Sequence, residues 1–151
     1  MIDWPNYLGQ GLIKAQQPNF KQIEKQVLRA QKDLKTFHLV EKEDPEWASA
    51  IAYQAMLRMG RALLFSYGYL PVDRQQHKTV VEVTGKILGA KFSFVIKYFD
   101  RLRKKRNIFF YDSDDAHNFT EAKKAIEVAQ ELIAEIKSKI KTLNPQQEFK
   151  F

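Results

Sequence analysis

Apolar residues recur every three or four positions along most of this 151-residue chain. That spacing keeps side chains on one face of a helix, and it predicts five helices separated by turns. No stretch of useful length alternates in the manner of a β-strand. The predicted helices cover residues 19–37, 45–67, 74–88, 91–108 and 119–143. The pattern therefore indicates an all-α, antiparallel up-and-down five-helix bundle.

Residues at the predicted helix starts support these boundaries. Asn19 is a candidate N-cap, and Asp44-Pro45 places a proline at the first helical position, where its missing N–H costs nothing. Asn118-Phe-Thr-Glu121 resembles a capping box for the last helix. The second helix is apolar on most sides and is predicted to be the central one. Residues 1–17 and the polar tail after Pro145 are expected to be loosely held.

Length and composition limit the class of protein. We expect a single domain over residues 1–151 with an ordered core at about 19–143, because 151 residues suffice for one hydrophobic core. The absence of cysteine excludes disulfides, thiolate zinc sites and cysteine nucleophiles. The first residues do not read as a secretory signal, and no apolar stretch is long enough to span a membrane. These features predict a cytoplasmic protein without membrane association.

Positive charge is concentrated near the end of the fourth predicted helix. Between Lys97 and Arg106 the chain holds six cationic side chains and one carboxylate, Asp100, in a protein with a formal net charge of +7. Such a concentration favours a polyanion such as RNA, although a basic run often only solvates a helix face. The candidate phosphate contacts are Arg101, Arg103, Lys104 and Lys105.

Arg106 continues an apolar stripe instead of the charged face. The stripe runs through Val95, Phe99 and Leu102 in steps of four and three, and a further step of four reaches Arg106. A guanidinium stays charged when it is buried, so it needs an acceptor there. That acceptor is either a carboxylate of another helix, in a structural salt bridge, or a ligand or partner at an interface.

Other candidate chemistry is sparse, and we predict no cofactor and no metal site. His38, His77 and His117 lack metal-ligand spacing. His77 reads as an ordinary first-turn residue, and a contribution of His77 or His117 to the site stays open. Gly9-Gln-Gly11 lacks the strand, the third glycine and the lysine of a phosphate loop. The acidic cluster is suited either to a divalent ion or to the positive end of the last helix; its members are Asp112, Asp114 and Asp115.

Three sequence features together resemble the HEPN domains, a family of helical bundles common in prokaryotic toxin–antitoxin and defence systems. The first is Asp44-Pro-Glu-Trp-Ala at the start of the long apolar second helix, which also contains Ala52-Tyr-Gln-Ala-Met56 and Arg61-Ala-Leu-Leu64. The second is Gly68-Tyr-Leu-Pro71, followed by His77-Lys78 at the next helix start. The third is Arg106-Asn107 near the end of the fourth helix, with Tyr111 after it. The resemblance covers residues 20–143.

The resemblance implies a metal-independent endoribonuclease or RNA-binding component of a toxin–antitoxin system. Active HEPN domains use an arginine, four to six intervening residues and a histidine, and two chains pair to form one RNA-cutting cleft. Carried over here, the catalytic residues are Arg106, Asn107 and Tyr111, with tyrosine five positions after the arginine where active members have histidine. We therefore expect a homodimer with Arg106 near its two-fold axis. His117 is an alternative source of the missing imidazole.

The alternative is a catalytically silent HEPN module. Such a module binds RNA or a nucleotide, or pairs with a small nucleotidyltransferase-like partner. A tyrosine with a pKa of about 10 is a poor general base at neutral pH, so the substitution at Tyr111 favours this alternative.

Overall fold

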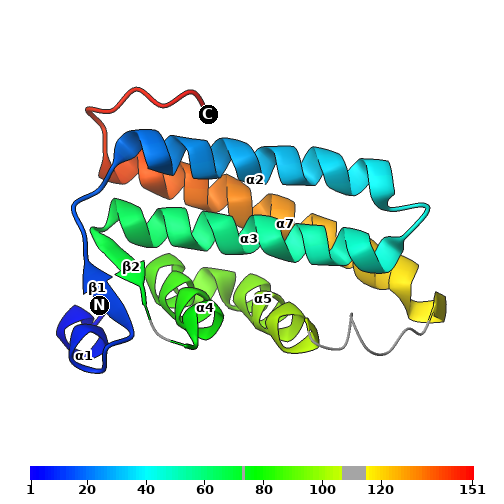
Figure 1. The fold of residues 1–151 in the computed structure, drawn as a ribbon, viewed down its shortest axis with the longest axis horizontal. Coiled ribbons are helices and arrows are strands. Elements are labelled where there is room, and N and C mark those ends of the chain that lie inside the picture. Colours follow the sequence, from blue (N-terminus) through cyan, green and yellow to red (C-terminus); the bar gives the residue numbers. More distant parts are fainter. Residues whose placement is uncertain (73, 107–114) are drawn as a thin grey trace.

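A computed structural model describes residues 1–72, 74–106 and 115–151, with the backbone alone for residues 115–118. Three long helices dominate the described chain, and shorter helices cover one flank of them (Figure 1). The α-helices are α1 (Trp4–Gly9), α2 (Phe20–Val40), α3 (Pro45–Ser66), α4 (Gln76–Leu88), α5 (Ser93–Lys105) and α7 (Asp115–Leu143). The remaining elements are a single-turn 3-10 helix, η1 (Ala90–Phe92), and two strands, β1 (Ile13–Ala15) and β2 (Tyr69–Pro71). The predicted all-α bundle is confirmed, with a small sheet added to it.

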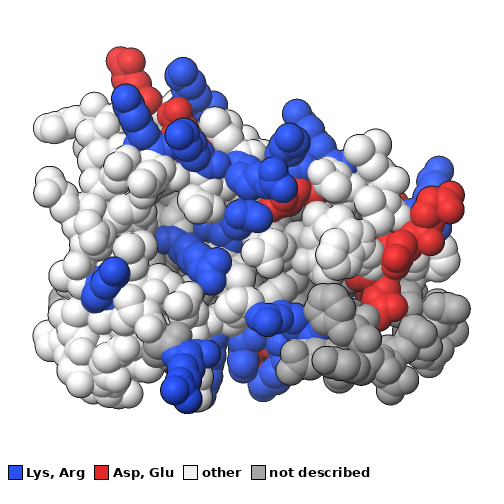
Figure 2. All heavy atoms as spheres, viewed as in Figure 1, with Lys and Arg blue, Asp and Glu red and all other residues white. Residues whose placement is uncertain are grey.

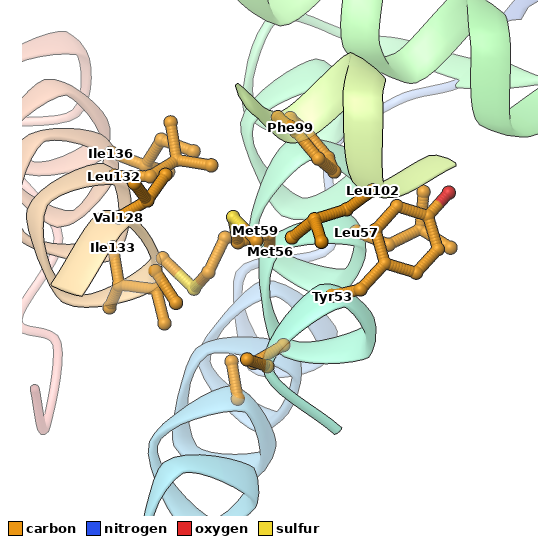
Figure 3. Close-up of a cluster of buried hydrophobic side chains, with 14 of the residues drawn as sticks. Tyr53, Met56, Leu57, Met59, Phe99, Leu102, Val128, Leu132, Ile133 and Ile136 are labelled. Atoms are coloured by element: carbon orange, nitrogen blue, oxygen red, sulfur yellow. The ribbon is translucent and has the colours of Figure 1, made fainter. Parts of the chain in front are cut away.

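Helix α3 lies at the centre of the bundle, as its apolar sequence predicts. It packs against α2 and α7, both of which also border each other, and α3 and α7 run opposite to α2 (Figure 1). Four small residues of α3 are fully buried and let the neighbouring helices approach closely; they are Ala48, Ala52, Ala55 and Ala62. Figure 3 shows Met56 and Met59 of α3 between Leu132 and Ile136 of α7 and Leu102 of α5. Burial of this apolar surface is the main source of stability.

Gly60 allows α3 and α4 to approach closely, and its replacement by alanine is expected to destabilise the fold. A Cβ at this position would clash with Val80 Cγ1 and lie 3.0 Å from Thr84 Oγ1. Overpacking of this kind costs about 1–3 kcal/mol, more than the roughly 1 kcal/mol that alanine gains in helix propensity. Thermal unfolding should therefore show a lower Tm for Gly60→Ala. Gly9→Ala is the control, because nothing lies within 4 Å of a Cβ there. An unchanged or raised Tm for Gly60→Ala would contradict this packing.

The starts of α2 and α3 follow the sequence prediction. The side chain of Asn19 accepts a hydrogen bond of 3.1 Å from the Gln22 amide, and Asp44 accepts one of 3.0 Å from the Trp47 amide. These bonds satisfy amides that have no partner within the helix. Trp47 itself is half exposed, at 50%, although the apolar pattern placed it among the residues of a buried helix.

The predicted boundaries of the later helices are less accurate. Helix α4 begins at Gln76, two residues after the expected start, and the fourth predicted helix opens with the turn η1. Its expected last residues, 107 and 108, lie outside the described residues. Helix α7 begins at Asp115, so the start predicted at residue 119 is wrong. The Glu121 carboxylate, expected in a capping box, instead accepts hydrogen bonds from Arg101 and Lys105 of α5.

The amino-terminal segment is ordered, which corrects the expectation of a loose lead-in. Helix α1 and strand β1 occupy it, and β1 pairs antiparallel with β2 through Ile13 opposite Pro71. Tyr7 and Ile13 are 5% and 3% exposed and pack beside Leu64 and Val83. Strands of three residues are too short to produce a readable alternation, which is why the sequence pattern missed them.

The carboxy-terminal tail packs on the bundle and is not frayed as predicted. Pro145 follows the end of α7 as expected, but the Lys150 amide then donates a hydrogen bond of 2.8 Å to Glu24 of α2. The Phe149 ring lies 6.2 Å from that of Phe20 and 4.8 Å from that of Phe151. Two aromatic side chains therefore anchor a segment whose average composition is polar. Among the described helices, none is long and apolar enough to cross a membrane.

Candidate functional site

A helical hairpin brings the start of α4 and the end of α5 together. Gly89, with a φ of +83°, ends α4 and turns the chain into η1 and α5. Gly85 lets the two helices approach, because a Cβ there would lie only 2.9 Å from Ile96 Cγ2. Each helix has 13 residues, so the first turn of α4 and the last turn of α5 are neighbours. His77 and Arg106 sit at these two ends.

Arg106, His77 and Tyr53 form a cluster drawn from three helices. The Arg106 Nη1 lies 2.7 Å from His77 Nδ1 and 3.1 Å from His77 Nε2. The Tyr53 hydroxyl, from the middle of α3, lies 2.8 Å from the same His77 Nδ1. The Tyr53 ring is buried, at 3% exposure, and packs beside Phe99. We name these three residues the Arg–His–Tyr cluster.

The surroundings keep His77 neutral. Burial, followed by the charges of Arg106, Arg61 and Arg103, lowers the pKa of His77 to about 4. An arginine can only donate hydrogen bonds, so the His77 ring must accept the one from Arg106. Burial also raises the pKa of Tyr53 to about 12, which keeps its hydroxyl protonated. The cluster thus combines a permanent cation, an unprotonated imidazole and a phenol.

The structure corrects the prediction of a buried Arg106 in part. Its side chain lies on the same side as Phe99 and Leu102, as the stripe predicts, because it reaches the Tyr53–His77 pair that packs there. It is nevertheless exposed, since α5 ends at Lys105 and the long side chain extends past the edge of the core. Its described acceptor is a histidine, not the carboxylate of a structural salt bridge.

The four cations predicted as phosphate contacts all lie beside carboxylates. Arg103 and Lys104 lie 2.8 and 3.1 Å from Asp100 of their own helix. Arg101 and Lys105 lie 2.6 and 2.8 Å from Glu121 of α7. Arg101 and Lys105 therefore tie α5 to α7, a structural role that the sequence did not reveal. Their predicted role as phosphate contacts stays a prediction.

A pocket of about 630 Å³ opens between the start of α4 and the end of α5. Among the described residues, four cations and His77 line it and no carboxylate does; the cations are Arg74, Lys78, Arg103 and Arg106. The N-cap residue of α4, Gln75, makes no side-chain cap hydrogen bond. A positive helix end and four cations around one opening suit an anion with several oxygens, such as a phosphate. Figure 2 shows cationic side chains at the lower edge of the molecule, where α4 and α5 lie in Figure 1.

Several predicted site residues lie outside what the structure describes. Asn107, Tyr111, Asp112 and Asp114 belong to the residues that are not described, and so do the side chains of Asp115 and His117. Their predicted roles remain predictions. Asp115 is the first residue of α7, at the positive end expected for a carboxylate. Among the described side chains, no group of acidic residues and histidines could hold a metal ion.

Sequence reasoning did not include Tyr53 in the site, and it left a role for His77 open. His77 was interpreted as an ordinary first-turn residue, and Tyr53 is one of many apolar residues of α3. Residues 77 and 106 are 29 positions apart, and only the α4–α5 hairpin brings them together. The available signal was weak: a single histidine at a helix start, in a chain with three histidines in all.

The fold and the site define a helical-bundle protein with a cationic, histidine-containing anion pocket. The HEPN domain family model matches residues 23–139, more than three-quarters of the chain. The chain therefore belongs to the HEPN domain family, as its sequence features indicated. No curated protein and no solved structure matches it.

Proposed function

We propose that this HEPN protein binds single-stranded RNA at the Arg–His–Tyr cluster and cleaves it without a metal ion. One observation carries the proposal: the Arg106 guanidinium lies 2.7 Å from the imidazole of His77. Cleavage of RNA by its own 2′-hydroxyl needs a group that takes a proton and a cation that stabilises charge on the phosphate. The cluster supplies both, although the motif position of active HEPN domains holds Tyr111 here.

The proposed reaction is an internal transfer of the phosphoryl group. The 2′-hydroxyl oxygen attacks the adjacent phosphorus while its proton passes to the unprotonated His77. The bond from phosphorus to the 5′-oxygen then breaks, leaving a 2′,3′-cyclic phosphate, and the proton returns to the departing 5′-oxygen. Arg106 stabilises the negative charge on the phosphate oxygens in the transition state. Tyr53, with its raised pKa, stays protonated and orients the imidazole.

In this scheme, phosphate binding raises the pKa of His77, which is low in the free protein. A bound phosphate offsets the positive charges of Arg106, Arg61 and Arg103, which together with burial lower the pKa of His77. The pKa of His77 therefore rises when RNA binds, toward the range in which an imidazole exchanges protons efficiently near neutral pH. RNA binding and proton uptake by His77 are coupled in this scheme.

The binding of RNA is expected to depend on salt. Each neutralised phosphate contributes a slope of about −0.7 to a plot of log affinity against log salt for single strands. Arg103 lines the pocket beside Arg106, so Arg103→Gln should weaken binding and flatten the slope by roughly one phosphate contact. Lys14→Gln, at an exposed position in β1, is the control. Affinity that is indifferent to ionic strength would mean that the basic run is only a solvated face.

Incubation of the purified protein with total RNA in EDTA tests the proposed activity. The expected result is fragments whose 3′ ends carry a cyclic phosphate. RNA that stays intact in EDTA and in Mg²⁺ alike would reject the nuclease. Fragments that appear only with Mg²⁺ would reject the metal-independent reaction.

The second candidate is the catalytically silent module, which binds RNA or nucleotide or pairs with a small nucleotidyltransferase-like protein. Tyr111 in place of the motif histidine favours it. A neighbouring gene for a small nucleotidyltransferase would support a toxin–antitoxin pair of this kind. In either function we propose a homodimer with Arg106 near the two-fold axis, since the exposed guanidinium is available to a second chain.

A further inference from the structure

A second pocket shares Arg106 with the anion pocket and lies between α2 and α3. Its volume is about 430 Å³, and Trp47, Tyr53, Gln54 and Arg58 of α3 contribute to its wall together with Arg106. Arg106 lines both pockets, and Tyr53 of this pocket lies 2.8 Å from His77 of the anion pocket at the start of α4, so the two pockets adjoin. A volume of this size is in the range of small-molecule sites.

Trp47 is the unusual residue of this pocket. Half of its surface is exposed although it belongs to the most buried helix of the bundle. A large aromatic ring that remains open to solvent in a pocket offers a face for stacking, and single-stranded nucleic acids bind proteins by stacking bases on such rings. The other tryptophan of the chain, Trp4, is already stacked on Tyr69 with ring centroids 4.4 Å apart.

The polar groups of the pocket are suited to the edge of a base. The Gln54 carboxamide, part-buried on α3, has no hydrogen-bond partner among the described residues, and it offers both a donor and an acceptor. Among the described residues of the wall, the one carboxylate is that of Asp33, and it is already paired because Arg29 and Arg58 lie 3.3 and 2.9 Å from it. With Asp33 neutralised, the wall does not repel a ligand attached to a phosphate.

We propose that the Trp47 pocket binds a nucleobase of the RNA whose phosphate contacts Arg106. The ribose separates a phosphate from its base, and the two pockets adjoin at Arg106, so one nucleotide can occupy both. Trp47 stacks on the base, and Gln54 forms hydrogen bonds to its edge. This inference rests on the proposed function, and it adds the part of the protein that distinguishes a base-carrying RNA from other polyanions.

Two short oligomers of equal charge test the nucleobase pocket on the intact chain. One is a single-stranded 2′-O-methyl RNA, which cannot be cleaved by the proposed reaction, and the other is the same backbone without bases. In Trp4→Phe, where Trp47 is the only tryptophan, the oligomer with bases should quench the fluorescence and the abasic oligomer should not. In Trp47→Phe the remaining Trp4 should not respond to either.

Affinity measurements with the same oligomers separate this pocket from the phosphate site. Trp47→Ala should weaken binding of the oligomer with bases about 10- to 100-fold and leave the abasic oligomer unchanged. Gln54→Ala should weaken the base-carrying oligomer by a smaller factor, and Trp47→Phe should retain most of the affinity. If wild type binds both oligomers equally, or if none of these variants changes their ratio, the nucleobase pocket is rejected while the phosphate site stands. If wild type binds neither oligomer, the proposed function fails, and the nucleobase pocket fails with it.

Discussion

Arg106→Ala is expected to lower the rate of RNA cleavage by about 10²- to 10³-fold while the helical fold is retained. The guanidinium is the group placed to stabilise charge on the transferred phosphoryl group, and no other cation lies so close to His77 among the described contacts. Because Arg106 is exposed, its removal should change the stability by no more than about 0.5 kcal/mol. Single-turnover cleavage and thermal unfolding provide the two measurements.

Arg101→Ala is the matched control for Arg106→Ala. It removes the same charge from the same helix, but its guanidinium contacts Glu121, 2.6 Å away, and it does not line the anion pocket. We expect only a modest loss of RNA affinity from it. Equal rates for wild type and Arg106→Ala, or equal losses in the two variants, would show that charge alone matters and that Arg106 has no particular place in the reaction.

His77→Ala is expected to reduce cleavage by about 10²- to 10⁴-fold, the usual contribution of general acid–base catalysis. Tyr111→Phe should retain most of the rate if His77 carries the proton, whereas Tyr111→His should raise the rate toward that of active HEPN domains.

In wild type, the acid limb of the pH profile of kcat/KM should lie near pH 4, because the pKa of His77 in the free protein is about 4. A large loss of cleavage rate in Tyr111→Phe, with little effect of His77→Ala, would show that Tyr111 and not His77 carries the proton.

The stability of the protein gives a readout of His77 that does not depend on activity. The pKa of His77 is about 4 in the folded protein and has its ordinary value of 6.5 in the unfolded chain. Between these two pH values the unfolded chain therefore binds a proton more readily than the folded protein does. The contribution of His77 to stability is therefore present above pH 6.5 and is lost as the pH falls toward 4. After allowance for solvent screening we expect a loss on the order of 1 kcal/mol.

His77→Gln should remove that part of the pH dependence, as measured by chemical denaturation between pH 4 and pH 7. His38→Gln is the control, because His38 is exposed on α2 and contacts only Glu41 among the described polar groups near it. A pH dependence that persists unchanged in His77→Gln would place the titrating group elsewhere.

Helix positions were predictable from the sequence because their signals are local. The three-and-four spacing and the caps at Asn19 and Asp44 act within a few residues, and both caps form the expected hydrogen bonds. The strands β1 and β2 were not predictable in this way, because each has only three residues and pairs with a segment more than fifty positions away. The tail was misjudged because Phe149 and Phe151 act as single anchors inside a polar stretch.

The site was predictable only for the residue that breaks a pattern. Arg106 stands out because a cation occupies an apolar position of the helix. The face on which its side chain lies was predicted correctly, but the side chain is exposed and not buried. His77 breaks no pattern, so its role depends on the α4–α5 hairpin, which no local signal specifies. The carboxylates that pair with the basic run were likewise hidden, since Glu121 comes from α7 and was assigned to a helix cap. Tertiary contacts between distant helices account for each of these differences.

The most direct measurement is an NMR titration of the His77 imidazole in the free protein and in the complex with a non-cleavable single-stranded RNA. In the free protein we expect the pKa of His77 at about 4, since burial and the neighbouring arginines disfavour its charged form. In the complex the pKa of His77 should rise toward or above 6.5, because a phosphate beside Arg106 compensates those positive charges. A pKa of His77 that is the same with and without bound RNA would contradict a phosphate site at the Arg–His–Tyr cluster.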